Sequence, residues 1–320
     1  MKNIYVTVIS LQHMAMGLAL AKALNKFGKL TAIYCIDHKA ADELHKLNLK
    51  NTKIYYPYQF ENSELKELKK IRSIPEFCWT CKSFILQHIL KEMPSVDWAI
   101  YLDSDMMIYG DPDKALPDYH EVLLTPHNFS SEFKHFEDNA GNFNAGYIAF
   151  KNSNNGLNAL SWWKEKCIES CSAVPVKGLY GDQVYLNKMS SKFSFVNINS
   201  NPGVNAGPWN ILNNVIKAEG GNISIGNHSL LIYHMQGFKL YNFGFVNLYD
   251  GEIKIPKNIK ELIYTPYLKH LNSIFSIFDK KFTNPLFINI FKPKIIAREI
   301  KRKFLKKSNM HLGLSEGLRK

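Results

Sequence analysis

The sequence contains few cysteines and no long uninterrupted apolar segment. Its five cysteines, an odd number in 320 residues, do not suggest a disulfide framework and fit a reducing cytosol. The segment from Asn3 to Ala21 carries no charged residue, but Thr7 and Ser10 interrupt it, and its apolar spacing becomes helical after Ser10. We therefore predict a strand followed by a helix there, and neither a signal peptide nor a membrane span.

Net charge is also almost absent from most of the chain, although the total is +12. Residues 1–250 contain 24 Lys and Arg against 23 Asp and Glu, a net charge of +1, whereas residues 251–320 contain 16 against 5, a net charge of +11. A hydrophobic content of 46% is enough for a full core, and no internal repeat is present. We predict a folded domain over residues 1–250 and a basic tail over residues 251–320.

Strand-like and helical segments alternate within residues 1–250. Apolar runs predict strands, and amphipathic spacing predicts the helices between them. The expected strands after the first are 29–36, 52–57, 98–102, 121–126 and 143–150, and the expected helices include 40–47, 63–71 and 78–91. Such alternation predicts an α/β fold with a mainly parallel sheet flanked by helices.

Two carboxylates end one buried strand, in "DWAIYLDSDMMIYGDP" at residues 97–112. Asp103 and Asp105 would lie at the carboxyl edge of the sheet, where open α/β folds bind ligands. Carboxylates suit Mg²⁺ or Mn²⁺, whose other positions can take the phosphate oxygens of a nucleotide diphosphate. A simple turn remains an alternative, because Gly110 to Pro112 is a turn signal, and a phosphatase with an aspartyl nucleophile is another.

Three later motifs add polar residues to this pair. "FNAGYIAF" places Asn144 and Gly146 at the start of a strand, "YGDQVYLN" opens a helix with Asp182 and Gln183, and "LIYHMQGFK" ends a strand at His234. Taken singly, Asp182 could be a helix cap, His234 a core histidine and Asn144 a turn residue. The ordered set makes these separate explanations much weaker.

In this order the motifs resemble the GT-A nucleotide-sugar transferases, most closely glycosyltransferase family 8 and related bacterial polysaccharide and lipopolysaccharide enzymes. The resemblance covers roughly residues 1–240. It implies a GT-A catalytic domain over residues 1–250 that moves a sugar from a nucleotide-diphosphate donor, expected to be a UDP-sugar, to a saccharide acceptor. Retention at the anomeric carbon is implied rather than inversion. A nucleotide-sugar-binding protein without turnover is the non-catalytic alternative.

The resemblance also assigns roles to single residues. It implies a metal site for Mn²⁺ or Mg²⁺ at Asp103, Asp105 and His234. Asp182 and Gln183 match the pair that faces the anomeric carbon. The residues expected near the donor are Lys82, Ser104, Asn144, Gly146, Gly237 and Lys239. The chain lacks the Lys-Pro-Trp usual in the loop after the histidine, which weakens the assignment of Lys239, and Lys82 could equally be solvated.

Two stretches have competing explanations. "CWTC" at 78–81 is spaced like a redox motif, and Cys78 and Cys81 could instead join Cys167 and Cys171 in a zinc site. Cys167 and Cys171 share a helix face with apolar residues, so we expect them to be core thiols. "GVNAGPWNI" at 203–211 could stack a sugar on Trp209 and bind its hydroxyl groups through the amides of Asn205 and Asn210, or it could be a packed loop.

The basic tail contains two amphipathic segments. The apolar residues in each recur at helical spacing: Leu268, Leu271, Phe275, Phe278 and Phe282 in the first, and Ile296, Ile300 and Phe304 in the second. Residues 292–307 add eight basic side chains against one acid. We expect an interfacial helix on an anionic membrane surface, in preference to a nucleic-acid arm or a packed helix. This places the protein in the cytoplasm, peripheral on the inner face of the cell membrane, with a lipid-linked glycan as acceptor.

Overall fold

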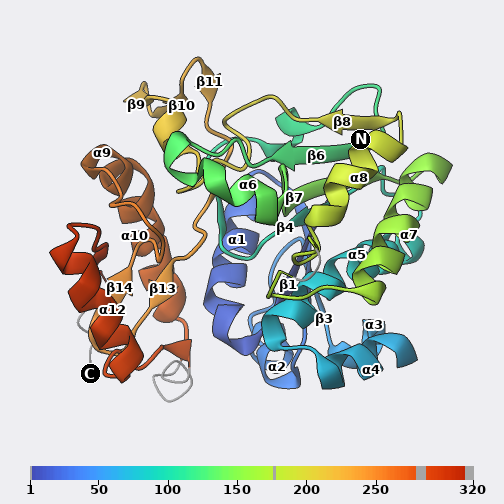
Figure 1. The fold of residues 1–320 in the computed structure, drawn as a ribbon. Coiled ribbons are helices and arrows are strands. Elements are labelled where there is room, and N and C mark those ends of the chain that lie inside the picture. The colour runs from blue at the N-terminus through green and yellow to red at the C-terminus, as the bar shows by residue number, and fades with distance from the viewer. Residues whose placement is uncertain (1, 176–177, 279–285, 314–320) are drawn as a thin grey trace.

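A computed structural model describes residues 2–175, 178–278 and 286–313, and its centre is a seven-stranded sheet (Figure 1). The strand order is β3-β2-β1-β4-β7-β6-β8. Every strand runs parallel to the others except β7, which is antiparallel to both of its neighbours. The strands are β1 (Asn3–Ile9), β2 (Leu30–Cys35), β3 (Thr52–Tyr55), β4 (Trp98–Leu102), β6 (Val122–Pro126), β7 (Phe143–Lys151) and β8 (Val196–Ile198).

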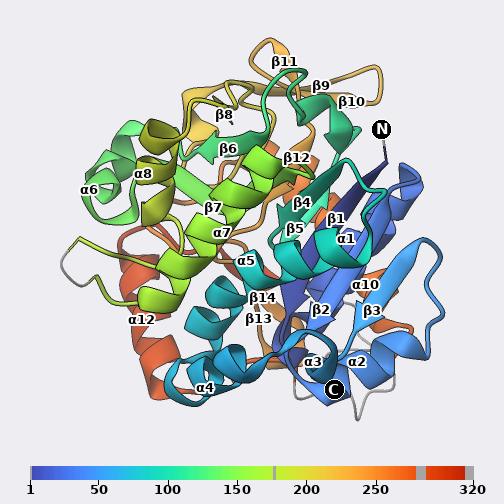
Figure 2. The ribbon, with the colours of Figure 1, turned by 90° about the vertical axis from the view of Figure 1, so that its right-hand side faces the viewer.

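Helices cover both faces of this sheet, so its central strands are buried on both sides. Alternate residues of a strand point to opposite faces. In β1, Tyr5 and Ile9 pack in one core with α1 and α2, whereas Ile4 and Val6 pack in a second core with α5, α7 and α8. Figure 2 shows α5 and α7 lying across the second face.

The helices around the sheet include those predicted at 40–47 and 63–71, which begin and end close to these limits. They are α1 (Met14–Lys26), α2 (His38–His45), α3 (Pro57–Phe60), α4 (Ser63–Ile71), α5 (Ile74–Glu92), α6 (Glu137–Ala140), α7 (Asn154–Glu169) and α8 (Val184–Lys192). The helix expected at 78–91 begins earlier, at Ile74. Its start is fixed by Glu76, whose carboxylate accepts from the Ser73 backbone N–H at 2.9 Å in a capping box.

Three small sheets complete the fold. β5 (Met106–Ile108) pairs antiparallel with β12 (Ile232–His234). β9 (Ile216–Glu219), β10 (Asn222–Ile225) and β11 (His228–Ser229) form a hairpin sheet, and β13 (Lys239–Leu240), β14 (Phe245–Asn247) and β15 (Met310–Leu312) form another. The first of these sheets matters most for the site, because it joins the loop after β4 to a strand more than 100 residues later.

The two amphipathic segments of the tail differ in what covers them. In α10 (Thr265–Phe275), Leu268, Leu271 and Phe275 are buried against the core that contains α1. The prediction that this first segment is interfacial is therefore wrong, because its apolar face packs on the domain. Phe278 packs partly against the same core, and Phe282 lies outside the described residues.

The second segment forms α12 (Pro293–Phe304), and its apolar side chains remain exposed. The division of the chain near residue 250 stays a prediction, although residues 255–275 share one core with α1. Among the described residues, no helix combines the length and the apolar character needed to cross a membrane.

Candidate functional site

The β5–β12 ladder brings Asp105 and His234 together from distant parts of the sequence. His234 pairs with Met106, the residue after Asp105, and the Met235 backbone N–H donates to the Asp105 backbone oxygen at 2.8 Å. As a result, His234 Nε2 lies 3.1 Å from Asp105 Oδ1. The short strand after the Asp-Ser-Asp turn thus fixes the spacing between a carboxylate and an imidazole.

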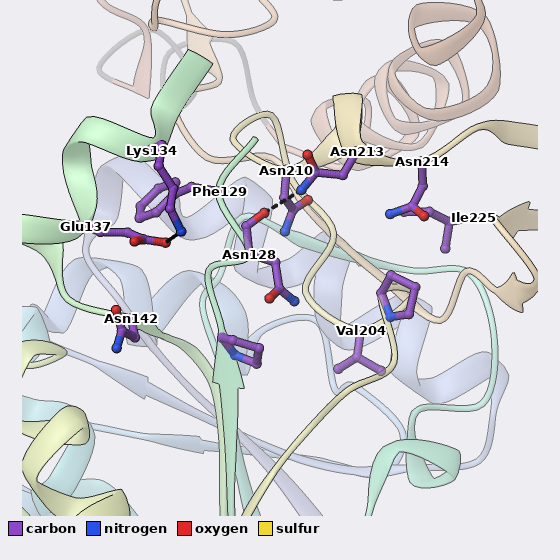
Figure 3. Close-up of a pocket in the computed structure, with 12 residues that line it drawn as sticks. Asn128, Phe129, Lys134, Glu137, Asn142, Val204, Asn210, Asn213, Asn214 and Ile225 are labelled. Carbon is purple, nitrogen blue, oxygen red and sulfur yellow. Dashed lines mark hydrogen bonds and ion pairs between the residues drawn. The ribbon is translucent and has the colours of Figure 1, made fainter. Parts of the chain in front are cut away.

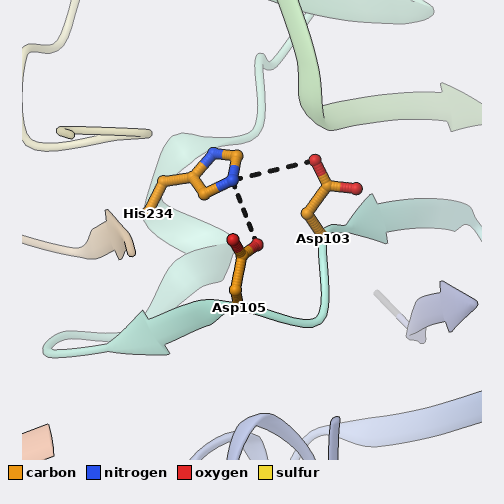
Figure 4. A group of neighbouring side chains, drawn as sticks. All are labelled: Asp103, Asp105 and His234. Atoms are coloured by element: carbon orange, nitrogen blue, oxygen red, sulfur yellow. Dashed lines mark ion pairs between the residues drawn. The ribbon is translucent and has the colours of Figure 1, made fainter. Parts of the chain in front are cut away.

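Asp103 completes a group of three possible metal ligands (Figure 4). Its Oδ2 lies 3.8 Å from His234 Nε2, and one ligand atom from each of the three residues lies within 4.8 Å of the others. Figure 4 shows the imidazole turned toward both carboxylates. Two oxygens and one nitrogen suit Mn²⁺, which accepts mixed ligands, and they leave positions open for a phosphate.

Asp105 and His234 each stabilise the charged form of the other. Burial alone would raise the pKa of the Asp105 carboxyl, but the adjacent His234 ring overrides this and lowers the pKa to about 2. Burial would lower the pKa of His234, and Asp105 and Asp103 more than reverse that effect, so its pKa is raised. A cation bound here would replace the imidazole proton between the same carboxylates.

A second ionic pair holds the other oxygen of Asp103. Lys82 Nζ on α5 lies 3.2 Å from Asp103 Oδ1 and 3.2 Å from Asp182 Oδ2, and the Tyr101 hydroxyl donates to Asp103 Oδ1 at 2.9 Å. Burial would lower the pKa of Lys82, but Asp103 and then Asp182 raise it. Lys82 is therefore a buried cation and not a solvated one, and it directs Asp103 Oδ2 toward His234.

The buried side-chain amides of Asn144 and Asn205 hold the three possible metal ligands in place through hydrogen bonds. Asn144 Oδ1 accepts from Asn205 Nδ2 at 3.0 Å, and Asn205 Oδ1 lies 3.1 Å from His234 Nδ1, which orients the ring. Gly146 leaves room for this arrangement. A Cβ atom there would lie 2.7 Å from His234 Cε1 and 2.9 Å from Asp103 Oδ2. Both distances are shorter than the contacts that Cβ atoms make in proteins.

These side chains line one cavity of about 350 Å³. The structure gathers most of the residues that the motifs single out there, namely Lys82, Asp103, Ser104, Asp105, Asn144, Gly146, Asp182, Gln183, His234 and Lys239. Gly237 lies outside the lining, in the turn before β13, with a φ of 75° that favours glycine. Asp182 is buried, which raises the pKa of its carboxyl, and the Gln183 side-chain amide donates to the Ala140 backbone oxygen at 2.9 Å.

Sequence reasoning missed several lining residues. His13, Trp79, Tyr180 and Gln236 line the same cavity and come from four separate segments, with no common spacing to connect them. Tyr101 could have been predicted, because it lies in β4 two residues before Asp103, and its hydroxyl group donates to Asp103 Oδ1.

The structure decides both open alternatives. Among the described residues, no cysteine belongs to a group with metal-ligand spacing. Burial raises the pKa of Cys78 to about 12 and raises that of Cys81, which is the opposite of an activated thiol. The four-cysteine zinc site is therefore not formed among the described residues, and the raised thiol pKa values argue against a redox role for Cys78 and Cys81.

Trp209 belongs to a packed loop and not to a sugar-stacking platform. It is 2% exposed, and its indole N–H donates to the His127 backbone oxygen at 2.8 Å. The Asn210 amide donates to the same oxygen at 2.9 Å. Because these groups are used internally, the packed-loop alternative is the one that the structure favours, and Asn205 supports His234.

Comparison with known proteins places this cavity in a known fold, although no protein-family model matches the chain. The chain is 29% identical over 293 residues to the uncharacterized protein YfnF of Bacillus subtilis (strain 168), covering 88% of this chain and 97% of YfnF. It is 29% identical over 244 residues to YfnD of the same organism, covering 75% and 78%. The solved galactosyltransferase LgtC, in complex with donor and acceptor sugar analogues, matches with a TM-score of 0.51 at 12% identity over 85% of this chain and 95% of that chain. This likeness confirms the predicted fold, a mainly parallel sheet flanked by helices.

Proposed function

We propose that this protein is a metal-dependent glycosyltransferase that moves a sugar from a nucleotide diphosphate to a saccharide acceptor. The observation that carries the proposal is the Asp103, Asp105 and His234 group at the carboxyl edge of the sheet, inside a ligand-sized cavity. The fold shared with a galactosyltransferase supports the same reaction class by analogy. UDP as the nucleotide and retention at the anomeric carbon rest on the resemblance of the ordered motifs.

Each residue of the cavity then has a role. A Mn²⁺ or Mg²⁺ ion bound by the three ligands would supply positive charge to the leaving diphosphate. Lys82 orients Asp103 and neutralises Asp182, so that two carboxylates can lie in one small cavity. Lys239, at the rim, would bind the phosphate oxygens. Gln183 is anchored through Ala140 and faces the sugar, and Asp182 is held beside it.

Hydrolysis of nucleotide sugars tests this proposal without knowledge of the acceptor. Purified protein is incubated with UDP-, GDP- and TDP-hexoses and Mn²⁺, and nucleotide release is measured with and without EDTA. We expect slow release from one nucleotide class, stopped by EDTA and lost in Asp105→Asn. Binding of a nucleotide sugar without release, in the presence of acceptor extracts, would instead indicate a binding protein without turnover.

We propose, as the charge and spacing of the tail predict, that the tail helix places the protein on the cytoplasmic face of the membrane. Arg298 donates to Asp250 at 2.7 Å and Arg302 contacts the same carboxylate, so one face of α12 is held on the domain. On another face Ile296, Ile300 and Phe304 are 42, 64 and 86% exposed. Six lysines of residues 292–307 form no ion pair with any described residue, namely Lys292, Lys294, Lys301, Lys303, Lys306 and Lys307. We propose that this face binds anionic lipid near a lipid-linked acceptor.

A further inference from the structure

A second, larger cavity of about 630 Å³ lies beside Asn210, one of its lining residues (Figure 3). It is bounded by the loop after β6, by residues 202–214 and by β10. Figure 3 shows Asn128, Asn142 and Asn214 around it. The catalytic proposal above uses none of these residues.

An intermediate cavity lies between this cavity and the cavity that contains Asp103, Asp105 and His234, which we call the donor cavity. The intermediate cavity, of about 350 Å³, shares Tyr180, Gln183 and Gln236 with the donor cavity and Phe129 with the second cavity. Its wall is aromatic, with Phe133 and Phe136 among the lining residues. The three cavities are therefore neighbours in the order donor cavity, intermediate cavity and second cavity. The first contains the possible metal ligands, and the last is lined by asparagines.

The lining of the second cavity matches the hydroxyl groups of a sugar. The side-chain amides of Asn128, Asn142 and Asn214 form no hydrogen bond with any described residue, and each offers both a donor and an acceptor. A sugar hydroxyl likewise donates and accepts. Phe129 is half-buried at the junction and presents an apolar ring beside them.

The cavity is also electrically neutral. Among the described residues, the charged side chains that line it are Lys134 and Glu137, and these are paired at 2.6 Å. By contrast, the donor cavity contains carboxylates, lysines and histidines. An anionic ligand such as a phosphate or an acidic sugar would find no free cation here, so the chemistry favours an uncharged saccharide.

From this row of cavities we propose that the acceptor is a neutral oligosaccharide, and that the second cavity binds a sugar unit remote from the transfer site. The inference rests on the proposed function, which supplies the saccharide acceptor that would extend from the donor cavity. The unit that receives the transferred sugar would occupy the aromatic cavity. A further unit would pass Phe129 and bind the asparagine amides.

Glycan binding without donor tests this inference separately from catalysis. Full-length protein is applied to an array of bacterial surface oligosaccharides printed beside their component monosaccharides. Two variants alter the cavity, Asn214→Trp by filling it and Asn214→Ala by removing one amide. Asn222→Trp is the matched control, because Asn222 is an exposed asparagine of the adjacent hairpin that lines none of the three cavities.

We expect wild type and Asn222→Trp to bind neutral oligosaccharides about tenfold more tightly than the monosaccharides. Asn214→Trp should remove that preference and Asn214→Ala should reduce it. Equal binding by Asn214→Trp and wild type, a preference for anionic glycans, or no preference for oligosaccharides would overturn the inference. Nucleotide release by the wild-type protein is measured in parallel, so a failure of the proposed reaction is recognised independently of glycan binding.

Discussion

The donor cavity and the surface of α12 both concentrate charge, but they arrange it in opposite ways. In the cavity, Lys82 and Asp182 are each 3% exposed and are paired with each other, and Asp103 is held by Lys82 and Tyr101. On α12 most lysines are exposed and form no ion pair with the part of the chain that the structure describes. Buried charge needs partners in the fold, whereas exposed charge is available to a partner outside it. We therefore assign chemistry to the first region and location to the second.

The largest effect should come from Asp105→Asn. The amide nearly keeps the shape of the carboxylate but removes a charged ligand beside His234. We expect donor turnover to fall by about 10²–10³-fold, measured as nucleotide release at limiting Mn²⁺. A circular dichroism spectrum like that of wild type controls for folding. Undiminished turnover would show that the group is not the metal site, and His234→Ala should act in the same direction but more mildly.

Lys82→Met should destabilise the fold as well as the reaction. It leaves Asp182 buried without its cation, and breaking a buried ion pair lowers the free energy of unfolding by about 3 kcal/mol. Urea unfolding measures the change. The double variant Lys82→Met, Asp182→Asn should recover part of the loss, because it removes the uncompensated charge. If the single variant unfolds at the wild-type urea concentration, the pair is not a structural element.

Gln183→Ala should separate chemistry from binding within the donor cavity. The side chain faces the cavity from a position anchored by Ala140, and we propose that it faces the reacting sugar. We expect kcat to fall about tenfold with little change in the affinity for donor, the pattern of an interaction strengthened in the transition state. Equal losses in both quantities would make Gln183 a ground-state contact.

Phe304→Ser should give the smallest effect of these substitutions. It should change membrane binding and leave the donor cavity unaffected. Phe304 is 86% exposed at the end of α12, so its removal should weaken binding to anionic vesicles about fivefold and leave the fold intact. Tyr119→Ser is the matched control, since Tyr119 is 93% exposed on a segment without a basic helix. Cosedimentation measures both, and wild-type binding should weaken as salt rises. Identical sedimentation of the two variants contradicts a membrane role for this face.

How much the sequence predicts differs between these regions for a physical reason. Periodicity identifies the strand before Asp103 and the apolar faces of both tail helices, because the spacing of apolar residues is a local property. Whether another part of the protein covers an apolar helix face depends on residues far away in the sequence. α10 and α12 have similar patterns, yet Leu271 is buried against the domain and Ile300 is 64% exposed. The sequence therefore predicts amphipathic helices but not which of them packs.

The same limit applies inside the site. The ordered motifs identified the carboxylates and His234, but the support from Asn205 and the burial of Lys82 depend on contacts between distant segments. In the sequence, the Gly and Asn residues around Trp209 are typical of a loop in which the indole could stack on a sugar. Its hydrogen bond to the His127 backbone, 82 residues away, could not be read from that loop.

The most direct test of the account is whether nucleotide and metal binding depend on each other. Calorimetric titration of UDP into wild-type protein, with Mn²⁺ and then with EDTA, measures this coupling. We predict at least about tenfold tighter UDP binding with Mn²⁺, and loss of that difference in Asp105→Asn, because the three ligands hold the ion that binds the diphosphate. Equal UDP affinity with and without Mn²⁺ in the wild-type protein would contradict a metal-dependent donor site at Asp103, Asp105 and His234.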